Sequence, residues 1–303
     1  MPQTTKGRKS AKRKMGETAL GQNNYGKSRV RMVKVSRKGR VHTVREIDVA
    51  IALEGDFDAI HCGDNSLCLP TDTMKNTVYA LGKDHPLETI EEFALHLARH
   101  FVKNNRQVRS ASVAISQVPW KRVKQPRGEH PHCFIKGSDE RQTCEAWVGS
   151  EIEDVTSGIE GLVILKSTDS AFSGYLKDRF TTLPETRDRV FCTSVTAMWD
   201  YPVRPVGGKK GSAIDYGRER EAIRRALIDT FAAHKSESVQ QTLHEMGRAA
   251  LKASPAADSI RLSLPNRHCL LVNLKPFGMS NKNEIFVPTD EPHGLIEATI
   301  ERR

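Results

Sequence analysis

The chain has no long apolar run: none approaches the ~20 consecutive residues that a helix needs to cross a bilayer, which argues against a helical membrane protein. Its N-terminus is basic but no apolar stretch follows, so the pattern of a secretory signal is missing as well. There is also no Gly-x-Gly-x-x-Gly loop of the kind that binds dinucleotides. The 303 residues, 38% hydrophobic and 28% charged, predict a soluble globular chain with room for two ordinary domains.

The six cysteines are scattered and form no Cys-x-x-Cys pair. In a chain of this size we expect them to be free thiols in a reducing compartment. Two clusters resemble parts of a zinc site, namely His61-Cys62 with Cys68 and His130-Pro131-His132-Cys133. Neither has a second ligand pair at zinc-site spacing, so we expect ordinary residues and no metal.

The net charge of +10 is distributed unevenly, because residues 1–20 hold six basic residues against one acid, Glu17. This segment has no aromatic residue and no periodic apolar pattern, which predicts a disordered basic tail. Such a tail can attract RNA or anionic surfaces weakly, but a solvated tail without a function is the favoured interpretation. We therefore expect no specific nucleic-acid partner.

The segment Gly21–Ser28 matches the phosphate-loop pattern G-x-x-x-x-G-K-[ST] letter for letter. A true phosphate loop follows a buried strand and opens a helix whose backbone N–H groups face the phosphates. Here a basic tail precedes the segment, and the alternating residues Val30, Met32 and Val35 after it predict a strand. We therefore do not expect nucleotide binding.

In the first half, alternating apolar residues predict two strands, then an amphipathic helix and two more strands. On the helix Ile90, Phe93, Leu97 and Phe101 share one face, whereas charged residues including Glu91 are expected largely elsewhere. A turn at Lys38-Gly39 separates the first two strands. The expected strands are Arg29–Val35, Thr43–Leu53, Ser110–Val118 and a short one near Cys144–Val148, and the expected helix is Pro86–Asn104.

The second half repeats this order, with two strands, two helices and two strands. The expected strands are Gly161–Lys166, Phe191–Tyr201, Ile260–Leu264 and Cys269–Leu274, and the expected helices are Ala213–Ala233 and Ser236–Ala253. A strand pair, helices and a strand pair in each half favour antiparallel α+β domains with helices on one face of the sheet. The boundary is expected near residue 150, which divides the chain into domains 21–150 and 151–303.

The segment Leu162–Arg189 resembles the signature of urate oxidases, through Lys166-Ser167-Thr168, Ser170, Phe172, Tyr175, Phe180, Leu183 and Arg189. Other segments match the same family in order, and the resemblance runs from about residue 22 to the end of the chain. These segments are Asn24-Tyr25-Gly26-Lys27, Leu53-Glu54-Gly55, Thr71-Asp72, Lys75-Asn76-Thr77, His130-Pro131-His132, Ser238-Val239-Gln240, Ser263–His268 and Pro292–Leu295.

The resemblance implies a fold of two tandem T-fold domains, each an antiparallel sheet with helices on one face. It also implies a homotetramer in which the sheets of neighbouring subunits close into a tunnel-shaped barrel. This agrees with the repeated strand and helix order derived from the periodicity. Because neighbours would complete each sheet, we expect the isolated subunit to be unstable.

Urate is a flat purine that is anionic at neutral pH, so it is recognised best by a planar cation, an amide and an aromatic face. The resemblance assigns these roles to Arg189, whose guanidinium can bind bidentately, to Gln240, and to Phe172. It further implies that Leu183 and the backbone of Val239 line the slot. Each of these residue types taken alone is more often solvated or part of a core, so the combination carries the prediction.

The resemblance places Thr71 and Asp72 at the five-membered ring of urate, directly before Thr73–Tyr79, which we expect to begin a helix. The N-terminus of a helix offers free N–H groups and a partial positive charge. Plain N-capping by either residue is compatible with this role.

For the chemistry, the resemblance assigns a proton relay to Lys27, Thr71 and His268, with Asn266 beside the oxygen or water site. Removing a second proton from urate yields a dianion that can donate an electron to O2 directly, so no cofactor is expected. The implied products are 5-hydroxyisourate and hydrogen peroxide. Because Lys27, Thr71 and Asp72 lie in the first half, the resemblance implies that each site is shared between two subunits.

Three other interpretations remain open. A T-fold enzyme for another purine or a pterin generally adds a metal with His and Cys ligands, for which no convincing cluster is present. A nucleic-acid-binding protein would use the basic tail, and a non-catalytic homologue would have lost relay residues that this chain retains. The chain ends in Glu301-Arg302-Arg303 rather than a Ser-Lys-Leu peroxisomal address, which favours a bacterial-type cytoplasmic enzyme.

Overall fold

A computed structural model describes residues 19–206 and 214–303. The predicted basic tail therefore lies almost entirely outside the described residues. The first half contains β1 (Tyr25–Lys38), β2 (Val41–Gly55), α1 (Asp58–His61), α2 (Thr71–Asp84), α3 (Ile90–Asn104), β3 (Val108–Val118), β4 (Trp120–Gln125), β5 (Gly128–Lys136) and β6 (Arg141–Val148).

The second half contains β7 (Ile152–Lys166), β8 (Phe191–Asp200), β9 (Arg204–Pro205), α4 (Tyr216–Ala233), α5 (Val239–Ala253), β10 (Ser259–Ser263), β11 (Asn266–Leu271), a 3-10 turn (Lys275–Phe277), β12 (Phe286–Gly294) and β13 (Glu297–Glu301). A strand pair, helices and further strands therefore follow one another in both halves, as predicted.

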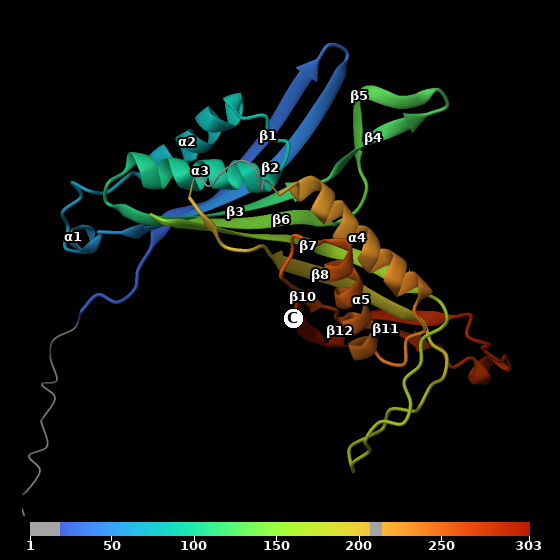
Figure 1. Cartoon of the computed structure of the whole chain (residues 1–303). Helices are drawn as coiled ribbons and strands as arrows, with labels where there is room; N and C mark the ends of the chain where they lie inside the picture. Colours follow the sequence, from blue (N-terminus) through green and yellow to red (C-terminus); the bar gives the residue numbers. More distant parts are fainter. Residues whose placement is uncertain (1–18, 207–213) are drawn as a thin grey trace, which may run out of the picture.

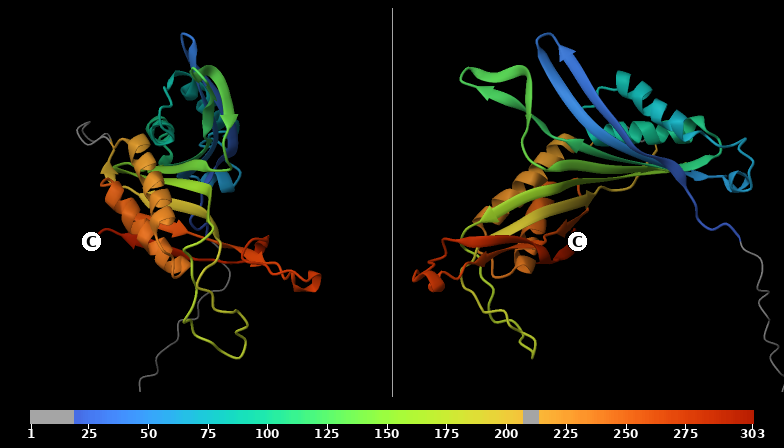
Figure 2. Two further views of the ribbon diagram at one scale, coloured as in Figure 1. Left: turned by 90° about the vertical axis from the view of Figure 1, so that its right-hand side faces the viewer. Right: turned by 180° about the vertical axis from the view of Figure 1, so that it is seen from behind.

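One antiparallel sheet runs through the whole chain in the order β1-β2-β3-β6-β7-β8-β10-β13. The two halves meet at β6 and β7, which pair from Arg141 opposite Glu160 to Val148 opposite Glu153. β11 pairs with β8 and β12, and β4 with β5 forms a separate hairpin (Figure 1). The long helices α2 to α5 lie on one face of the sheet (Figure 2). The predicted α+β class is thus confirmed.

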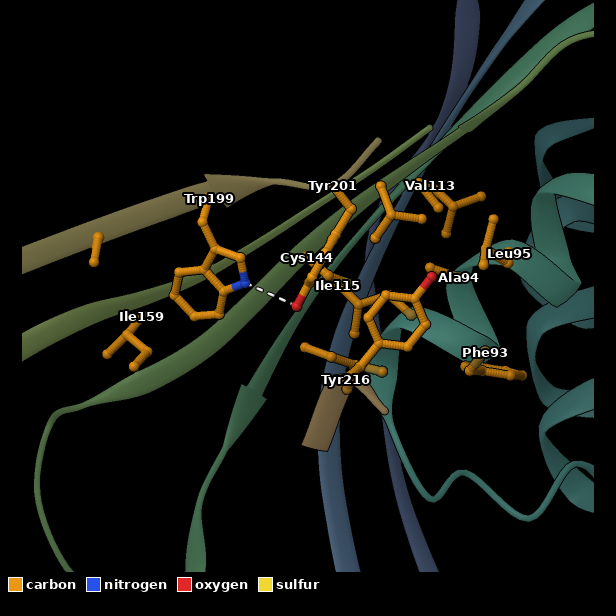
Figure 3. Close-up of a cluster of buried hydrophobic side chains, with 14 of the residues drawn as sticks. Phe93, Ala94, Leu95, Val113, Ile115, Cys144, Ile159, Trp199, Tyr201 and Tyr216 are labelled. Carbon is orange, nitrogen blue, oxygen red and sulfur yellow. Dashed lines mark hydrogen bonds between the residues drawn. The ribbon is translucent and has the colours of Figure 1, made fainter. Parts of the chain in front are cut away.

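The core lies between the helices and the sheet because the strands alternate apolar and polar residues. On β2, for example, Ile47, Val49, Ile51 and Leu53 are buried. The buried apolar residues of both halves form a single cluster, and Figure 3 shows the part that joins α3, the central strands and α4. There the indole N–H of Trp199 donates a hydrogen bond to the Tyr201 hydroxyl at 2.8 Å.

The predicted helix Pro86–Asn104 is shorter than expected, because α3 begins at Ile90. Thr89 adopts an extended conformation and its side chain caps the helix by accepting from the Glu92 backbone N–H. The expectation that Glu91 lies on a polar face is wrong, since its side chain is fully buried. Arg220 of α4 and Ser157 of β7 bind its carboxylate, and periodicity within one helix does not reveal such partners.

Three Arg–Glu pairs join the halves across β6 and β7. Glu91 of α3 pairs with Arg220 of α4 in the core, and Arg99 of α3 holds Glu153 of β7 through Nε–Oε2 and Nη2–Oε1 contacts of 2.7 and 2.6 Å. The third pair joins Arg224 of α4 to Glu140 before β6 (Nε–Oε1 and Nη2–Oε2, 2.7 and 2.8 Å). These contacts fix the orientation of the two helix layers relative to each other.

The remaining predicted elements are present. Most of their ends differ by a few residues, but β7 begins at Ile152, well before the predicted strand Gly161–Lys166, and the predicted helix start at Ala213 lies outside the described residues. The turn between the first strands includes Gly39, whose φ of 60° favours glycine. The sequence reasoning did not identify the β4–β5 hairpin, the short α1, or strands β12 and β13. Across the described stretches, no helix combines the length and the apolar character needed to span a membrane.

Candidate active site

Arg189 lies just before β8, half-buried against the chain that leaves β7. Its backbone N–H donates to the Ser170 carbonyl at 2.8 Å, and its Nε donates to the Ser170 hydroxyl at 3.3 Å. Its guanidinium carbon lies 5.5 Å from the centroid of the Phe172 ring. Burial lowers the pKa of Arg189, and no carboxylate among the described residues contributes to this shift. The site thus holds a cation that is well placed for an anionic ligand.

Phe172 is held to the returning chain by two backbone hydrogen bonds with Thr186, of 2.8 and 3.0 Å. Its ring stacks on Tyr175 at 4.7 Å with an interplanar angle of 14°. The Tyr175 hydroxyl donates to the carbonyl of Leu183, whose side chain is exposed. Phe172, Arg189 and Leu183 are therefore parts of one folded loop, and Tyr175 covers part of the ring that the prediction assigned to urate.

Val239 and Gln240 are the first two residues of α5. The Ser238 side chain caps this helix by accepting from the Gln241 N–H at 3.1 Å. The other N–H groups of the first turn have no partner within the helix and carry a partial positive charge. The Gln240 side chain is exposed while that of Val239 is buried, so an amide side chain and free backbone donors lie at the same helix end.

Asn266 and His268 alternate along β11 and are both half-buried. Asn266 lies opposite Thr193 of β8, and His268 lies opposite Thr289 of β12. The Thr193 hydroxyl is buried without a hydrogen-bond partner among the described residues. Because Arg189 precedes β8 by two residues, β11 brings Asn266 and His268 to the same end of the molecule as Arg189.

Lys27, Thr71 and Asp72 form a second group in the first half. Thr71 begins α2, two residues earlier than predicted, and its N-cap is Pro70, which offers no side-chain cap. The pKa of Asp72 is lowered chiefly by its hydrogen bond with Lys75, and in smaller part by the charge of Lys27. Lys27 on β1 thus lies close to the free N-terminus of α2.

Gly26 explains why the chain around Lys27 takes this path. A Cβ at this position would lie 1.7 Å from the Ile51 carbonyl oxygen, so only glycine fits against β2. The pairing with β2 shifts between Lys27 and Val30, where Arg29 has a φ of 60°. The segment enters a strand and not a helix, which confirms that Gly21–Ser28 does not have the structure of a phosphate loop.

The two groups lie at opposite ends of the sheet. β1 begins and β2 ends on the side of the molecule where α1 and the start of α2 lie, whereas β11 and the loop between β7 and β8 lie at the far end (Figures 1 and 2). The chain therefore brings Phe172, Arg189, Gln240, Asn266 and His268 to one region and Lys27 with Thr71 and Asp72 to another. It does not bring the two regions together.

A protein-family model described as Uricase matches residues 23–146 and 155–297 of the chain. A uricase of Arthrobacter globiformis is 42% identical over 287 residues, covering 94% of this chain and 91% of the relative. The chain belongs to the uricase family. A uricase of Danio rerio is 36% identical over 92% of this chain and 93% of the relative.

Solved structures agree with the assignment of the fold. A crystal structure of the Arthrobacter globiformis uricase superposes with a TM-score of 0.87 at 41% identity, over 95% of this chain and 96% of that chain. A uricase of Bacillus fastidious matches with a TM-score of 0.79 at 21% identity, over 93% and 94% of the two chains, and shows the fold alone. The tandem T-fold architecture implied by the family resemblance is therefore confirmed.

Sequence reasoning assigned no role to Ser236, although it connects the parts of the second-half region. Its carbonyl accepts from the Ala171 N–H at 2.7 Å, and its N–H donates to the Asp169 carbonyl at 2.9 Å. Ser170 and Lys166 were part of the family resemblance but also had no role. A serine in a loop before a predicted helix gives no distinctive signal, so only the fold reveals this contact.

Proposed function

We propose that the chain oxidises urate with O2 and water, giving 5-hydroxyisourate and hydrogen peroxide without a cofactor, at sites shared by two subunits. The observation that carries this proposal is the separation of the two groups of candidate residues to opposite ends of one sheet. One end offers an anion-binding cation, an amide and an aromatic ring. The other offers a lysine beside a helix N-terminus. Each group contains only part of the binding residues and part of the proton relay, so neither group alone forms a complete site.

In the proposed shared site, urate lies between two helix N-termini that come from different subunits. At one end, Arg189 and Gln240 bind the pyrimidine side of the anion beside the start of α5, with Phe172, Leu183 and Val239 lining the slot. At the other, Thr71 and Asp72 present the first turn of α2 to the five-membered ring. Each helix end stabilises a negative charge by about 0.3–1 kcal/mol, and the Arg189 fork adds charge-assisted hydrogen bonds.

The relay consists of Lys27, Thr71 and His268. It removes a proton from the urate anion, and the electron-rich dianion then reduces O2 while water adds to the purine. The two ring nitrogens of His268 can donate and accept a proton, and the Thr71 hydroxyl can pass a proton without holding charge. In this proposal Asn266, two residues from His268 on β11, holds the oxygen or water molecule.

The assembly proposed for this function is a homotetramer of two-domain subunits, divided near residue 150, whose sheets join into a barrel around a tunnel. The sheet of one chain ends in the open edges of β1 and β13, which are able to pair with another chain. Its helix-free face contains a hollow of about 820 Å³ that is lined by both charged and apolar side chains, among them Arg31, Asp48 and Met198. Apolar side chains exposed on strands suit burial against neighbours; they include Val33, Leu165, Leu270 and Val287.

The function is tested by mixing the purified protein with urate in the presence of a metal chelator. We expect the ultraviolet absorbance of urate to fall while O2 is consumed and peroxide appears in equal molar amounts. Absence of urate loss in air-saturated buffer would reject the proposal.

A cytoplasmic location is part of the same proposal, since all six cysteines lie outside any disulfide, which suits a reducing compartment.

A further inference from the structure

In each half, the two long helices are joined by a turn of the same design, which we call a corner. The first corner lies between α2 and α3, and the second lies between α4 and α5. His85 ends α2 and Thr89 caps α3, while His234 ends α4 and Ser238 caps α5. The spacing between the two caps is the same in both corners. The second residue of the following helix is Glu91 in one half and Gln240 in the other. Glu91 is buried against Arg220, so only the second corner presents this position to solvent.

A lysine from the sheet caps the first helix of each corner. Lys34 on β1 donates to the carbonyls of Gly82 and Lys83 at 2.8 and 2.9 Å. Lys166, the last residue of β7, donates to the carbonyl of His234 and lies 5.3 Å from the centroid of the Phe231 ring. A cation at this end of a helix satisfies free carbonyls and complements the helix dipole.

The chain that follows Lys166 remains attached to the second corner. The Ser236 N–H donates to the Asp169 carbonyl at 2.9 Å, and the Ala171 N–H donates to the Ser236 carbonyl at 2.7 Å. Phe172 is the next residue along this chain. Lys166 and the backbone of Ser236 therefore connect the start of α5 to the loop that carries Phe172.

Buried hydroxyl groups lie on both sides of this connection, where Ser170 and Ser236 form a parallel backbone bridge. Ser236, Ser170 and Thr242 are almost completely buried. The Thr242 hydroxyl donates to the Ser236 hydroxyl at 2.8 Å, and the Ser170 hydroxyl accepts from Arg189 Nε at 3.3 Å. The side chain that aims Arg189 and the residue that fixes α5 are thus neighbours in one hydrogen-bonded strip.

We propose that Lys166 and Ser236 are positioning residues, which fix the distance between Gln240 and the Phe172–Arg189 pair without touching the substrate. This inference rests on the proposed function, because it assumes that these three residues bind urate. The spacing of an amide and a guanidinium that hold one flat ligand must be accurate, since hydrogen bonds weaken steeply once donor and acceptor leave their preferred distance and angle. The capped corner supplies that accuracy.

The test compares Lys166→Met with Lys34→Met, which removes the same kind of cap from the first corner. We expect Lys166→Met to raise the KM for urate roughly tenfold while kcat changes little, because Lys27 and Thr71 of the relay lie in the other half and His268 lies on β11, outside the corner. Both Met variants lose one helix cap, so we expect them to lower the thermal midpoint by similar amounts. Lys34→Met, however, should leave the KM for urate unchanged. Lys166→Arg, which retains a cation, restores most of the affinity.

An equal rise in KM for both Met variants would overturn the proposal, as would an unchanged KM in Lys166→Met or a fall in kcat alone. If Lys166→Met does not fold, Thr242→Val replaces it, with Thr242→Ser as its control and the same criteria. Wild-type protein that fails to oxidise urate would reject the proposed function itself. Wild-type turnover combined with an unchanged KM in the variant would reject only the positioning role.

Discussion

Glu91 and Arg220 form an ion pair that is buried in the core and joins the helix layer of the first half to that of the second. The Ser157 hydroxyl of β7 also donates to the Glu91 carboxylate, so this carboxylate is bound from both α4 and the sheet. Glu91 is the second residue of α3, the position that Gln240 occupies in α5. In the first half the corner serves the packing of the fold, and in the second it is available for a ligand.

Removing one partner of this pair should destabilise the protein strongly. Glu91→Ala leaves Arg220 charged and buried without its counter-ion, which typically costs about 3–5 kcal/mol. Chemical denaturation followed by circular dichroism measures the change. Glu88→Ala, an exposed carboxylate near the start of the same helix, should change the free energy of unfolding by no more than about 0.5 kcal/mol. Similar losses in both variants would contradict the role of the pair.

Stability should decrease in acid because of His85. Burial lowers the pKa of His85 below its ordinary value of 6.5, and the charges of His96 and Lys34 lower it further. A histidine whose folded pKa is lowered favours the folded state only while it is neutral. Its contribution is therefore complete above about pH 6.5 and declines as the pH falls from there through the lowered pKa.

The substitution His85→Asn tests this pH dependence. The Nδ1 atom of His85 accepts from the Leu87 N–H at 3.0 Å, and an asparagine oxygen can accept the same hydrogen bond without titrating. We expect a flatter profile of thermal midpoint against pH between 7.5 and 5 for this variant than for the wild type. His61→Asn, at an exposed position, should retain the wild-type profile. A His85→Asn profile identical to the wild type would show that other groups control the acid response.

Arg189→Ala should lower kcat/KM for urate by about 100-fold, since hydrogen bonds to a charged group contribute about 1.5–3 kcal/mol each. Arg189→Lys restores the charge but not the planar fork, so it should recover only part of the loss. Steady-state kinetics at several urate concentrations measures both variants. Arg187→Ala is the matched control, because Arg187 is an exposed arginine in the same loop. Equal effects at both arginines would argue for general electrostatic attraction.

Gly26→Ala should reduce both stability and activity, because the new Cβ would collide with the Ile51 carbonyl oxygen at 1.7 Å. To relieve the collision, β1 must move away from β2 and carry Lys27 with it. Gly21→Ala introduces the same side chain where no heavy atom lies within 4 Å, and it should leave both properties unchanged. Thermal unfolding and urate turnover measured on the two variants distinguish a local collision from a general effect of the substitution.

The sequence predicted the parts of the fold that periodicity determines. The alternation in β2 and the apolar face of α3 were identified correctly because each follows from one element facing one core. The burial of Glu91 was not, since it depends on Arg220, more than a hundred residues away in the chain. The β4–β5 hairpin extends away from the core and has no strong alternation, so it gave no such signal.

The candidate residues of the active site came from resemblance to the uricase family, and the structure adds their arrangement. That Lys27 and Arg189 lie at opposite ends of one sheet follows from topology, which no local pattern contains. The stack of Tyr175 on Phe172 was equally unexpected, because it depends on how the loop after β7 folds back. The connection through Ser236 arises from backbone hydrogen bonds, which any residue type can make.

The most direct test of shared sites is to mix two inactive variants. Lys27→Ala and Arg189→Ala subunits are combined under conditions that allow subunit exchange, and urate turnover is measured before and after. In randomly mixed oligomers with two-subunit sites, about one site in four receives both intact residues, so activity should rise toward a quarter of the wild-type value. Each variant treated alone should remain inactive. If the mixture also remains inactive although mass spectrometry shows hybrid oligomers, the site does not span two subunits and the account is wrong.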